Sequence, residues 1–199
     1  MAVDASARKR VMLERSWVMQ VLKTELDGVL ILEPKLIGDA RGYFLESYQL
    51  ARYAEHGMTR PFIQDNLSRS VRGFVRGLHL QYSNTQGKLV SVMRGRVLDV
   101  AVDVRRASPS FGRHVAIELS EENRRQLWLP RGFAHGFSVL SETADFFYKC
   151  DAYYSPKDEL SIRWDDPAIG IDWQVETPAL SKDALLLSEV ANLPVYGQV

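Results

Sequence analysis

Residues capable of acid–base chemistry stand in a stretch with strand spacing. Residues 76–81 read RGLHLQ. Successive side chains of an extended strand point to opposite faces, so His79 and Gln81 share one face and Leu78 and Leu80 share the other. Because the histidine and the glutamine face away from two packed leucines, their face either meets water or lines a polar cavity.

Two other strand-like segments carry polar groups on one face. Asp99 and Asp103 alternate with apolar residues in VLDVAVDV, and Tyr148 alternates with Phe147 in ADFFYKC. Histidine is the usual base at neutral pH, a carboxylate can orient it, and a neutral tyrosine can donate a proton to the opposite face of a bound molecule. If His79 and Tyr148 meet in one cavity, they suit proton abstraction and return beside a carbonyl. On the pattern alone, the outward faces of a sandwich remain an alternative.

His135 follows a Pro-x-Gly turn in LPRGFAHGF, residues 129–137. This pattern recurs in small β-barrels of the cupin type, where the histidine can be a metal ligand. Such a site also needs an earlier His-x-His pair with a carboxylate nearby, and this sequence has His79 followed by Gln81 instead. Two distant histidines without a clustered carboxylate make a poor metal site. We therefore expect no bound metal, and His135 as a hydrogen-bonded residue at the barrel mouth.

Basic and aromatic residues could bind a nucleotide. Arg41, Arg76 and Lys88 each stand at a turn or a strand start and could together bind a diphosphate. Tyr154, which follows Tyr153, could stack on a base. Taken singly, such residues are more often surface or packing residues.

The composition describes an ordinary globular protein. The 199 residues include 25 basic and 25 acidic residues, so the formal net charge is zero. The overall charge therefore does not indicate binding to nucleic acid or to a membrane surface. Cys150 is the single cysteine, which excludes an intrachain disulfide and fits a reducing compartment. No apolar run approaches a membrane span, and the N-terminal stretch lacks the apolar core of a signal peptide. We expect a cytoplasmic protein that binds neither nucleic acid nor membrane.

Short apolar runs separated by turn signals predict an all-β sandwich or barrel. Residues 1–18 are interpreted as an N-terminal extension, and a disordered arm is one interpretation of it. Residues 19–199 are interpreted as one domain. Short helices are expected at residues 47–56 and 180–193. Strands are expected at residues 29–32, 43–48, 62–64, 74–81, 88–93, 97–104, 114–119, 126–129, 136–140 and 144–150.

Seven segments resemble, in order, the dTDP-4-dehydrorhamnose 3,5-epimerase family of nucleotide-sugar enzymes. The resemblance runs nearly continuously from about residue 29 to residue 173. It implies an all-β, cupin-type jelly-roll barrel that forms a homodimer and uses no metal or other cofactor. The implied reaction converts dTDP-4-dehydro-6-deoxy-D-glucose to dTDP-4-dehydro-L-rhamnose, a precursor for cell-surface polysaccharides. The segments are GVLILEPKLIGDARGYFLESY, IQDNLSRS, VRGLHLQ, QGKLVSVMRGRVLDVAVDVRRASPSFG, RQLWLPRGFAHGF, DFFYKCDAYYSP and WDDPAIGIDW.

The resemblance also implies roles for individual residues. His79 corresponds to the general base, Tyr148 to the general acid and Lys88 to a residue that stabilises the enolate. Tyr154 corresponds to the residue that stacks on thymine. The implied nucleotide or sugar contacts are Arg41, Glu46, Gln64, Asp65, Asn66, Arg76, Lys88, His135 and Glu159.

The C-terminal part departs from the family pattern. The family has a Leu-Ser-x-Lys-Asp motif whose aspartate holds the base histidine, and this chain reads LSKD, one residue shorter. We assign the aspartate to Asp183 and a ligand-contacting lysine to Lys182. Asp99, expected to face the same cavity, is the alternative partner of His79. Gln174 replaces a proline that usually follows the Ile-x-Trp motif.

Two other functions are alternatives. One is a related enzyme that epimerises carbon 3 or carbon 5 alone, or acts on another nucleotide-linked 4-keto sugar. The other is a non-catalytic cupin that binds nucleotide sugars. The presence of both His79 and Tyr148 argues against the second, because a binding protein needs no acid opposite a base.

Overall fold

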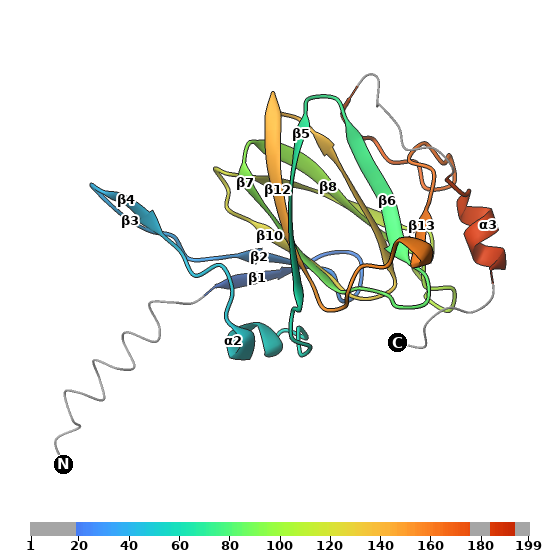
Figure 1. Ribbon diagram of the computed structural model, residues 1–199, viewed down its shortest axis with the longest axis horizontal. Coiled ribbons are helices and arrows are strands. Elements are labelled where there is room, and N and C mark those ends of the chain that lie inside the picture. The colour runs from blue at the N-terminus through green and yellow to red at the C-terminus, as the bar shows by residue number, and fades with distance from the viewer. Residues whose placement is uncertain (1–18, 176–183, 194–199) are drawn as a thin grey trace, which may run out of the picture.

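The chain forms two antiparallel β-sheets that face each other across a shared core (Figure 1). The computed structural model describes residues 19–175 and 184–193. The larger sheet has the strand order β1 (Gln20–Lys23), β2 (Leu30–Glu33), β10 (Gln126–Leu129), β7 (Lys88–Arg94), β12 (Thr143–Cys150) and β5 (Gln64–Val71). The smaller sheet has the order β13 (Glu159–Ser161), β6 (Val75–Gln81), β11 (Phe133–Val139), β8 (Arg96–Asp103) and β9 (His114–Ser120).

The remaining elements are short. The hairpin of β3 (Ile37–Asp39) and β4 (Gly42–Phe44) projects away from the barrel (Figure 1). The helices are α2 (Leu50–Ala54), the 3-10 helix η1 (Pro156–Asp158) and α3 (Leu187–Asn192). The predicted all-β jelly-roll barrel with short helices is confirmed. Within the described residues, no helix has the length and apolar character needed to cross a membrane.

Some predicted element boundaries were wrong. The sequence did not indicate β1, β3 or β13, which are short strands without a clear period. The strand predicted at residues 62–64 overlaps β5, which is Gln64–Val71, at one residue only. The C-terminal helix begins only at Leu187, because Leu185 is extended and forms a parallel bridge with Ile162. The predicted extension at residues 1–18 and the predicted helix residues 180–183 lie outside the described part of the chain, so the extension stays a prediction.

The central strands of the smaller sheet, β8 and β11, are buried on both faces. In β8, Val97 and Ala101 belong to the core between the sheets. Val100 and Val102 belong to a second core, which the C-terminal segment closes with residues such as Trp173. The alternation along β8 therefore separates two buried faces, and an acidic residue in this strand must find partners inside the protein.

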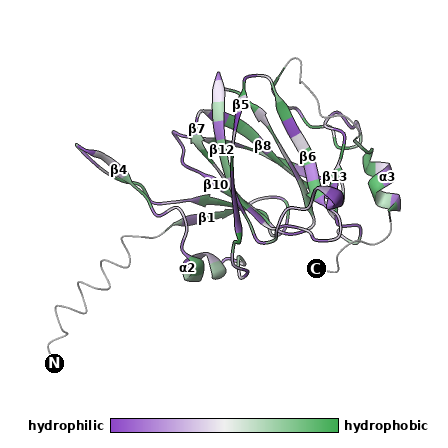
Figure 2. Cartoon of the chain, viewed as in Figure 1, coloured by the Kyte–Doolittle hydropathy of each residue, from purple (hydrophilic) through white to green (hydrophobic). Residues whose placement is uncertain are grey.

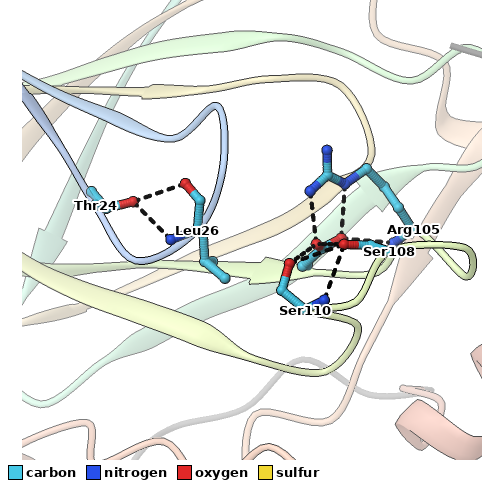
Figure 3. A network of polar contacts seen from close by, with 6 residues as sticks. Thr24, Leu26, Arg105, Ser108 and Ser110 are labelled. Carbon is cyan, nitrogen blue, oxygen red and sulfur yellow. Dashed lines mark hydrogen bonds and ion pairs between the residues drawn. The ribbon is translucent and has the colours of Figure 1, made fainter.

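The side chains of Arg105, Ser108 and Ser110 (Figure 3) surround the carboxylate of Asp103, which lies at the end of β8. It accepts hydrogen bonds from the Arg105 guanidinium at 2.9 and 2.7 Å and from the hydroxyls of Ser108 and Ser110 at 2.5 and 2.6 Å. Burial alone would raise the pKa of this fully buried carboxyl, but the hydrogen bonds lower it to about 2. The network therefore fixes the connection between β8 and β9.

Replacing Asp103 with asparagine should destabilise the protein only where the carboxylate is ionised. A pKa lowered from 3.8 to about 2 contributes about 2 kcal/mol to the free energy of unfolding at neutral pH. Because the folded pKa lies below the unfolded one, this contribution is complete above about pH 4 and is lost as the pH falls towards about 2. Urea unfolding of both proteins at neutral and at acidic pH measures the difference.

Asp165→Asn is the matched control. Asp165 pairs with Arg163 at the same sequence separation, but both side chains are largely exposed. Exposed pairs are worth roughly 0–1 kcal/mol, so this variant should change stability little at either pH. An Asp103→Asn loss that is equally large at both ends of the pH range would contradict the role given to the carboxylate.

Candidate active site

A cavity of about 380 Å³ lies between the two sheets, near the edge strands β5 and β13. This volume is typical of a small-molecule site. Leu80, Gln81, Gln86 and Cys150 form part of its wall. The predicted site residues that line it are Gln64, Asn66, Arg76, His79, Lys88, Tyr148, Tyr154 and Glu159.

The polar face of β6 points into this cavity. His79 lines it, while Leu78 and Leu80 belong to the second core on the other face of the sheet. Figure 2 shows the resulting bands of hydrophobic and hydrophilic residues along β6. Asp99 is fully buried and Tyr148 packs against the core between the sheets. The alternative that these residues form the outward faces of a sandwich is therefore wrong.

A β-bulge brings Arg76 to the same cavity. Strict alternation would place Arg76 on the leucine face, opposite His79. Between these two residues the pairing shifts, and β6 contains one residue more than β11. Gly77 lies in this irregular stretch with φ +117°, and a Cβ there would lie 2.5 Å from the Cα of Gly136. Only glycine allows the close approach, which turns Arg76 towards His79.

Burial sets the protonation of His79. Burial lowers the pKa of its imidazole, and the positive charges of Lys88, His135 and Arg76 lower it further. The negative charge of Glu159 opposes them. The net shift is downward, so the imidazole is neutral at neutral pH and can accept a proton.

Lys88 and Cys150 are cross-strand neighbours on β7 and β12. Burial lowers the pKa of the Lys88 ammonium, and the acidic groups around it oppose this shift. Burial raises the pKa of the Cys150 thiol to about 11. A protonated thiol is a weak nucleophile, so Cys150 serves as a wall of the cavity, where it accepts a 3.8 Å hydrogen bond from Asn66.

Tyr148 reaches the cavity from the larger sheet. It lies on β12 between Asn66 of β5 and Val90 of β7. Burial raises the pKa of its phenol, and the neighbouring Cys150 adds to this effect. The hydroxyl therefore keeps its proton at neutral pH. A neutral base and a protonated acid thus face one cavity from different sheets.

Asp99 is bonded to His135, and the alternative that it pairs with His79 is wrong. Its Oδ2 lies 2.9 Å from Nε2 of His135, and its Oδ1 has no partner among the described residues. His135 is the cross-strand neighbour of His79 and stacks on Phe146. It is buried behind the cavity and does not form its wall, because β11 is covered on both faces. Asp183 and Lys182 lie outside the described residues.

Asp65 faces away from the cavity. Along β5 the side chains alternate between half-buried and exposed, and Gln64 and Asn66 take the inner face. Asp65 is on the outer face, where its carboxylate lies 2.8 Å from Nζ of Lys149. Asp65 therefore does not line this cavity, and the cavity gives no support to its predicted contact with the nucleotide or sugar.

The structure also keeps Arg41 and Glu46 away from the cavity of their own chain. Arg41 lies at the tip of the projecting hairpin, bonded to Asp39 (Figure 1). Glu46 pairs with Arg52 of α2. Neither lines the cavity. The hairpin that carries Arg41 belongs to neither large sheet.

Four residues of the cavity wall, Leu80, Gln81, Gln86 and Cys150, were not among the predicted site residues. Gln81 and Cys150 each lie two residues from a predicted catalytic residue, so strand alternation contained the signal for both. Gln86 lies in the connection between β6 and β7 and carried no periodic signal. Among residues 19–175 and 184–193, no three His, Cys, Asp or Glu side chains are placed to hold a metal ion. Metal independence stays a prediction.

Known proteins resemble this chain over most of its length. The family model for dTDP-4-dehydrorhamnose 3,5-epimerase matches residues 23–189. The dTDP-4-dehydrorhamnose 3,5-epimerase of Salmonella typhimurium is 54% identical over 171 residues, which cover 84% of this chain and 93% of the relative. That of Methanothermobacter thermautotrophicus is 49% identical over 168 residues, covering 84% and 89%.

A solved structure agrees in fold as well as in sequence. The dTDP-6-deoxy-D-glucose-3,5-epimerase of Legionella pneumophila was crystallised in complex with dTDP-4-keto-L-rhamnose. It is 52% identical to this chain, with a TM-score of 0.85 over 90% of this chain and 100% of that one. The matches span both sheets and the strands that carry His79 and Tyr148, and the chain therefore belongs to the dTDP-4-dehydrorhamnose 3,5-epimerase family.

Proposed function

We propose that the chain epimerises carbons 3 and 5 of dTDP-4-dehydro-6-deoxy-D-glucose to give dTDP-4-dehydro-L-rhamnose. The observation that carries this proposal is that His79 and Tyr148 face one cavity from different sheets. Family membership and a relative crystallised with dTDP-4-keto-L-rhamnose support the same substrate class. A protein that only bound nucleotide sugars would need no acid opposite a base.

The proposed mechanism uses the acidity that the 4-keto group gives to the neighbouring carbons. His79 removes the proton from carbon 3 or carbon 5, and the electron pair moves to the keto oxygen. The charge of Lys88 stabilises this enolate in a partly buried site. Tyr148 then protonates the same carbon from the opposite face. General acid–base groups of this kind each contribute roughly 100- to 10,000-fold to the rate.

The outer part of the cavity suits the nucleotide. Tyr154 lies at the cavity rim with 47% of its surface exposed, which leaves a ring face open for a base. Arg76 supplies a positive charge in the same cavity, suitable for phosphate oxygens. We assign Tyr154 to the thymine, Arg76 to the diphosphate, and Gln64, Asn66 and Glu159 to polar contacts with the substrate.

We propose that two copies form a homodimer in which the hairpin of one completes the cavity of the other. The hairpin exposes Ile37, Tyr43 and Phe44, which are 40%, 54% and 57% exposed. Apolar side chains on a projecting hairpin are typical of an interface. The hairpin also carries Arg41, a predicted substrate contact that cannot reach the cavity of its own chain. An exchange of hairpins would account for both features.

We place the reaction in the cytoplasm. The single cysteine, Cys150, is buried and free. A chain without a disulfide is typical of a reducing compartment, and the location rests on this feature alone.

In deuterated water the protein should introduce deuterium at both carbon 3 and carbon 5 of the substrate. His79→Asn should abolish this exchange at both carbons, because one base serves both. Tyr148→Phe removes only the hydroxyl, so it should permit exchange without inversion and reduce epimerised product by about 100-fold or more. NMR spectra of the recovered sugar count the deuterons at each carbon.

His114→Asn is the matched control for the histidine variant. His114 lies on β9, outside the cavity, and its loss should leave the exchange at both carbons unchanged. Deuterium at a single carbon in the native protein would indicate a mono-epimerase instead. Normal turnover by Tyr148→Phe would show that another group is the acid.

Mixing two inactive variants should test the exchanged hairpins. Arg41→Ala and His79→Asn should each be inactive as homodimers. A mixed dimer would have one cavity with both residues intact, so co-refolding equal amounts should restore about one quarter of the native activity. A steady-state epimerisation assay of the mixture measures this.

The control mixes His79→Asn with Tyr148→Phe, whose residues come from the same chain's cavity. Every cavity in such a mixed dimer keeps one lesion, so activity should not return. If mixed dimers of Arg41→Ala and His79→Asn form in sedimentation experiments but stay inactive, the exchanged hairpin is wrong.

The pKa of His79 should respond to its charged neighbours in opposite directions. Glu159 raises this pKa, so Glu159→Gln should lower it further below the ordinary value of 6.5. Lys88 lowers it, so Lys88→Met should raise it. NMR titration of the His79 ring in the ligand-free protein measures both shifts, with His114 as an internal reference. Shifts of the same sign in both variants would contradict the proposed environment.

A further inference from the structure

We propose that Gln81 is a positioning residue that holds Tyr154 in the orientation needed to stack on the nucleotide base. The inference rests on the proposed function, in which Tyr154 meets the thymine. Gln81 shares the inner face of β6 with His79 and is only 3% exposed. A buried amide requires hydrogen-bond partners, and the partners of Gln81 surround Tyr154.

The amide of Gln81 binds the backbone on both sides of Tyr154. Its Nε2 donates to the carbonyl oxygen of Tyr153 at 3.1 Å, and its Oε1 accepts from the backbone N–H of Ser155 at 2.6 Å. A further bond runs from Nε2 to the carbonyl oxygen of Asn84 at 3.2 Å. One side chain therefore fixes the residue before Tyr154, the residue after it, and Asn84 in the connection between β6 and β7.

A second glutamine completes the support from the other sheet. The backbone N–H of Tyr154 donates to Oε1 of Gln64 on β5 at 2.9 Å. Gln64 is fixed in turn by a 3.0 Å hydrogen bond from its Nε2 to Oδ1 of Asn66. Three consecutive backbone positions, 153–155, are thus held by two side chains that come from opposite walls of the cavity.

Tyr154 depends on this backbone support because it has little packing of its own. It is 47% exposed and the preceding Tyr153 is 66% exposed. Residues 152–155 lie outside any helix or strand. The Tyr154 phenol is hydrogen-bonded to Glu159, and because no core surrounds the ring, the backbone sets the rest of its orientation. A pre-oriented ring loses less entropy when a base stacks on it.

The contact between the segment that follows β6 and the segment that follows β12 should survive loss of the Gln81 amide. The Asp158 carboxylate accepts hydrogen bonds from the backbone N–H groups of Ser83 and Asn84, both at 2.8 Å. The N–H of Tyr82 donates to the carbonyl oxygen of Asp158 at 2.8 Å. These bonds join the same two connections without Gln81. Its loss should therefore free the carbonyl group of Tyr153 and the N–H of Ser155, while the wall and the bond from Tyr154 to Gln64 stay in place.

The test is a double-mutant cycle with dTDP as the probe. Calorimetry gives the dissociation constant of dTDP for the native protein, Gln81→Met, Tyr154→Ala and the double variant. Base–aromatic stacking is worth enough that Tyr154→Ala should weaken dTDP binding by about five- to 150-fold. Gln81→Met should weaken it by about fivefold or more. In the Tyr154→Ala background, Gln81→Met should have almost no further effect.

Steady-state kinetics give a second readout that a purely structural role would not produce. Gln81→Met should raise KM for the nucleotide sugar, while kcat changes much less, because Tyr154 takes no part in proton transfer. Ser138→Ala is the control for lost stability. It removes another buried bond from a side chain to the backbone, 2.7 Å long and directed to Trp173 in the second core. At a matched loss of thermal stability it should leave the affinity for dTDP unchanged.

Each result decides between distinct conclusions. If Gln81→Met binds dTDP like the native protein, or loses as much affinity in the Tyr154→Ala background, the positioning role is wrong. If Tyr154→Ala itself binds normally, the proposed stacking contact fails first. If Gln81→Met does not fold, Gln81→Glu replaces it, because a carboxylate keeps the bond from Ser155 and repels the carbonyl oxygens of Tyr153 and Asn84.

Discussion

Burial of the central strands of the smaller sheet on both faces is the constraint on which the rest of this structure depends. An inward polar group in β6, β8 or β11 has little access to water, and an unpaired one costs roughly 1–3 kcal/mol. Asp99 is hydrogen-bonded to His135, and Asp103 accepts hydrogen bonds from Arg105 and two serines. The remaining inward polar face, on β6, lines the cavity. The buried polar side chains of β6 and β8 thus either find a partner inside the protein or line the cavity, although one oxygen of Asp99 has no partner among the described residues.

The same burial distributes protons in the way the proposed chemistry needs. It keeps the His79 imidazole neutral and the Tyr148 and Cys150 side chains protonated at neutral pH. Burial therefore reinforces the protonation state that the base, the acid and the inert thiol each have at neutral pH. Charged neighbours adjust this pattern, and Glu159 opposes the effect of Lys88 on His79. The cavity holds a base and an acid on different sheets, so protons can leave and return on different faces of a substrate.

Two kinds of local irregularity refine the regular sheets. The bulge at Gly77 places Arg76 on the cavity side of β6, which a regular strand would not do. The connection after β12 has no regular structure. Around Tyr154, the side-chain amides of Gln81 and Gln64 form the hydrogen bonds to the backbone that a neighbouring strand would otherwise form. The rigid sheets therefore carry the groups assigned to proton transfer, and side-chain hydrogen bonds hold the group assigned to the nucleotide.

The sequence by itself determined the all-β class, most strand positions and which residues share a strand face, because strand alternation and turn residues act over short distances. It left open whether the faces of His79 and Tyr148 line a cavity or meet water. The family resemblance added the reaction and most of the cavity residues. Only the tertiary structure decided that Asp99 is hydrogen-bonded to His135, that Asp65 faces outward and that Arg41 lies on a projecting hairpin. These outcomes depend on which strands become neighbours and on a one-residue bulge. Pairing partners and register are long-range properties, and the local pattern of a single strand does not contain them.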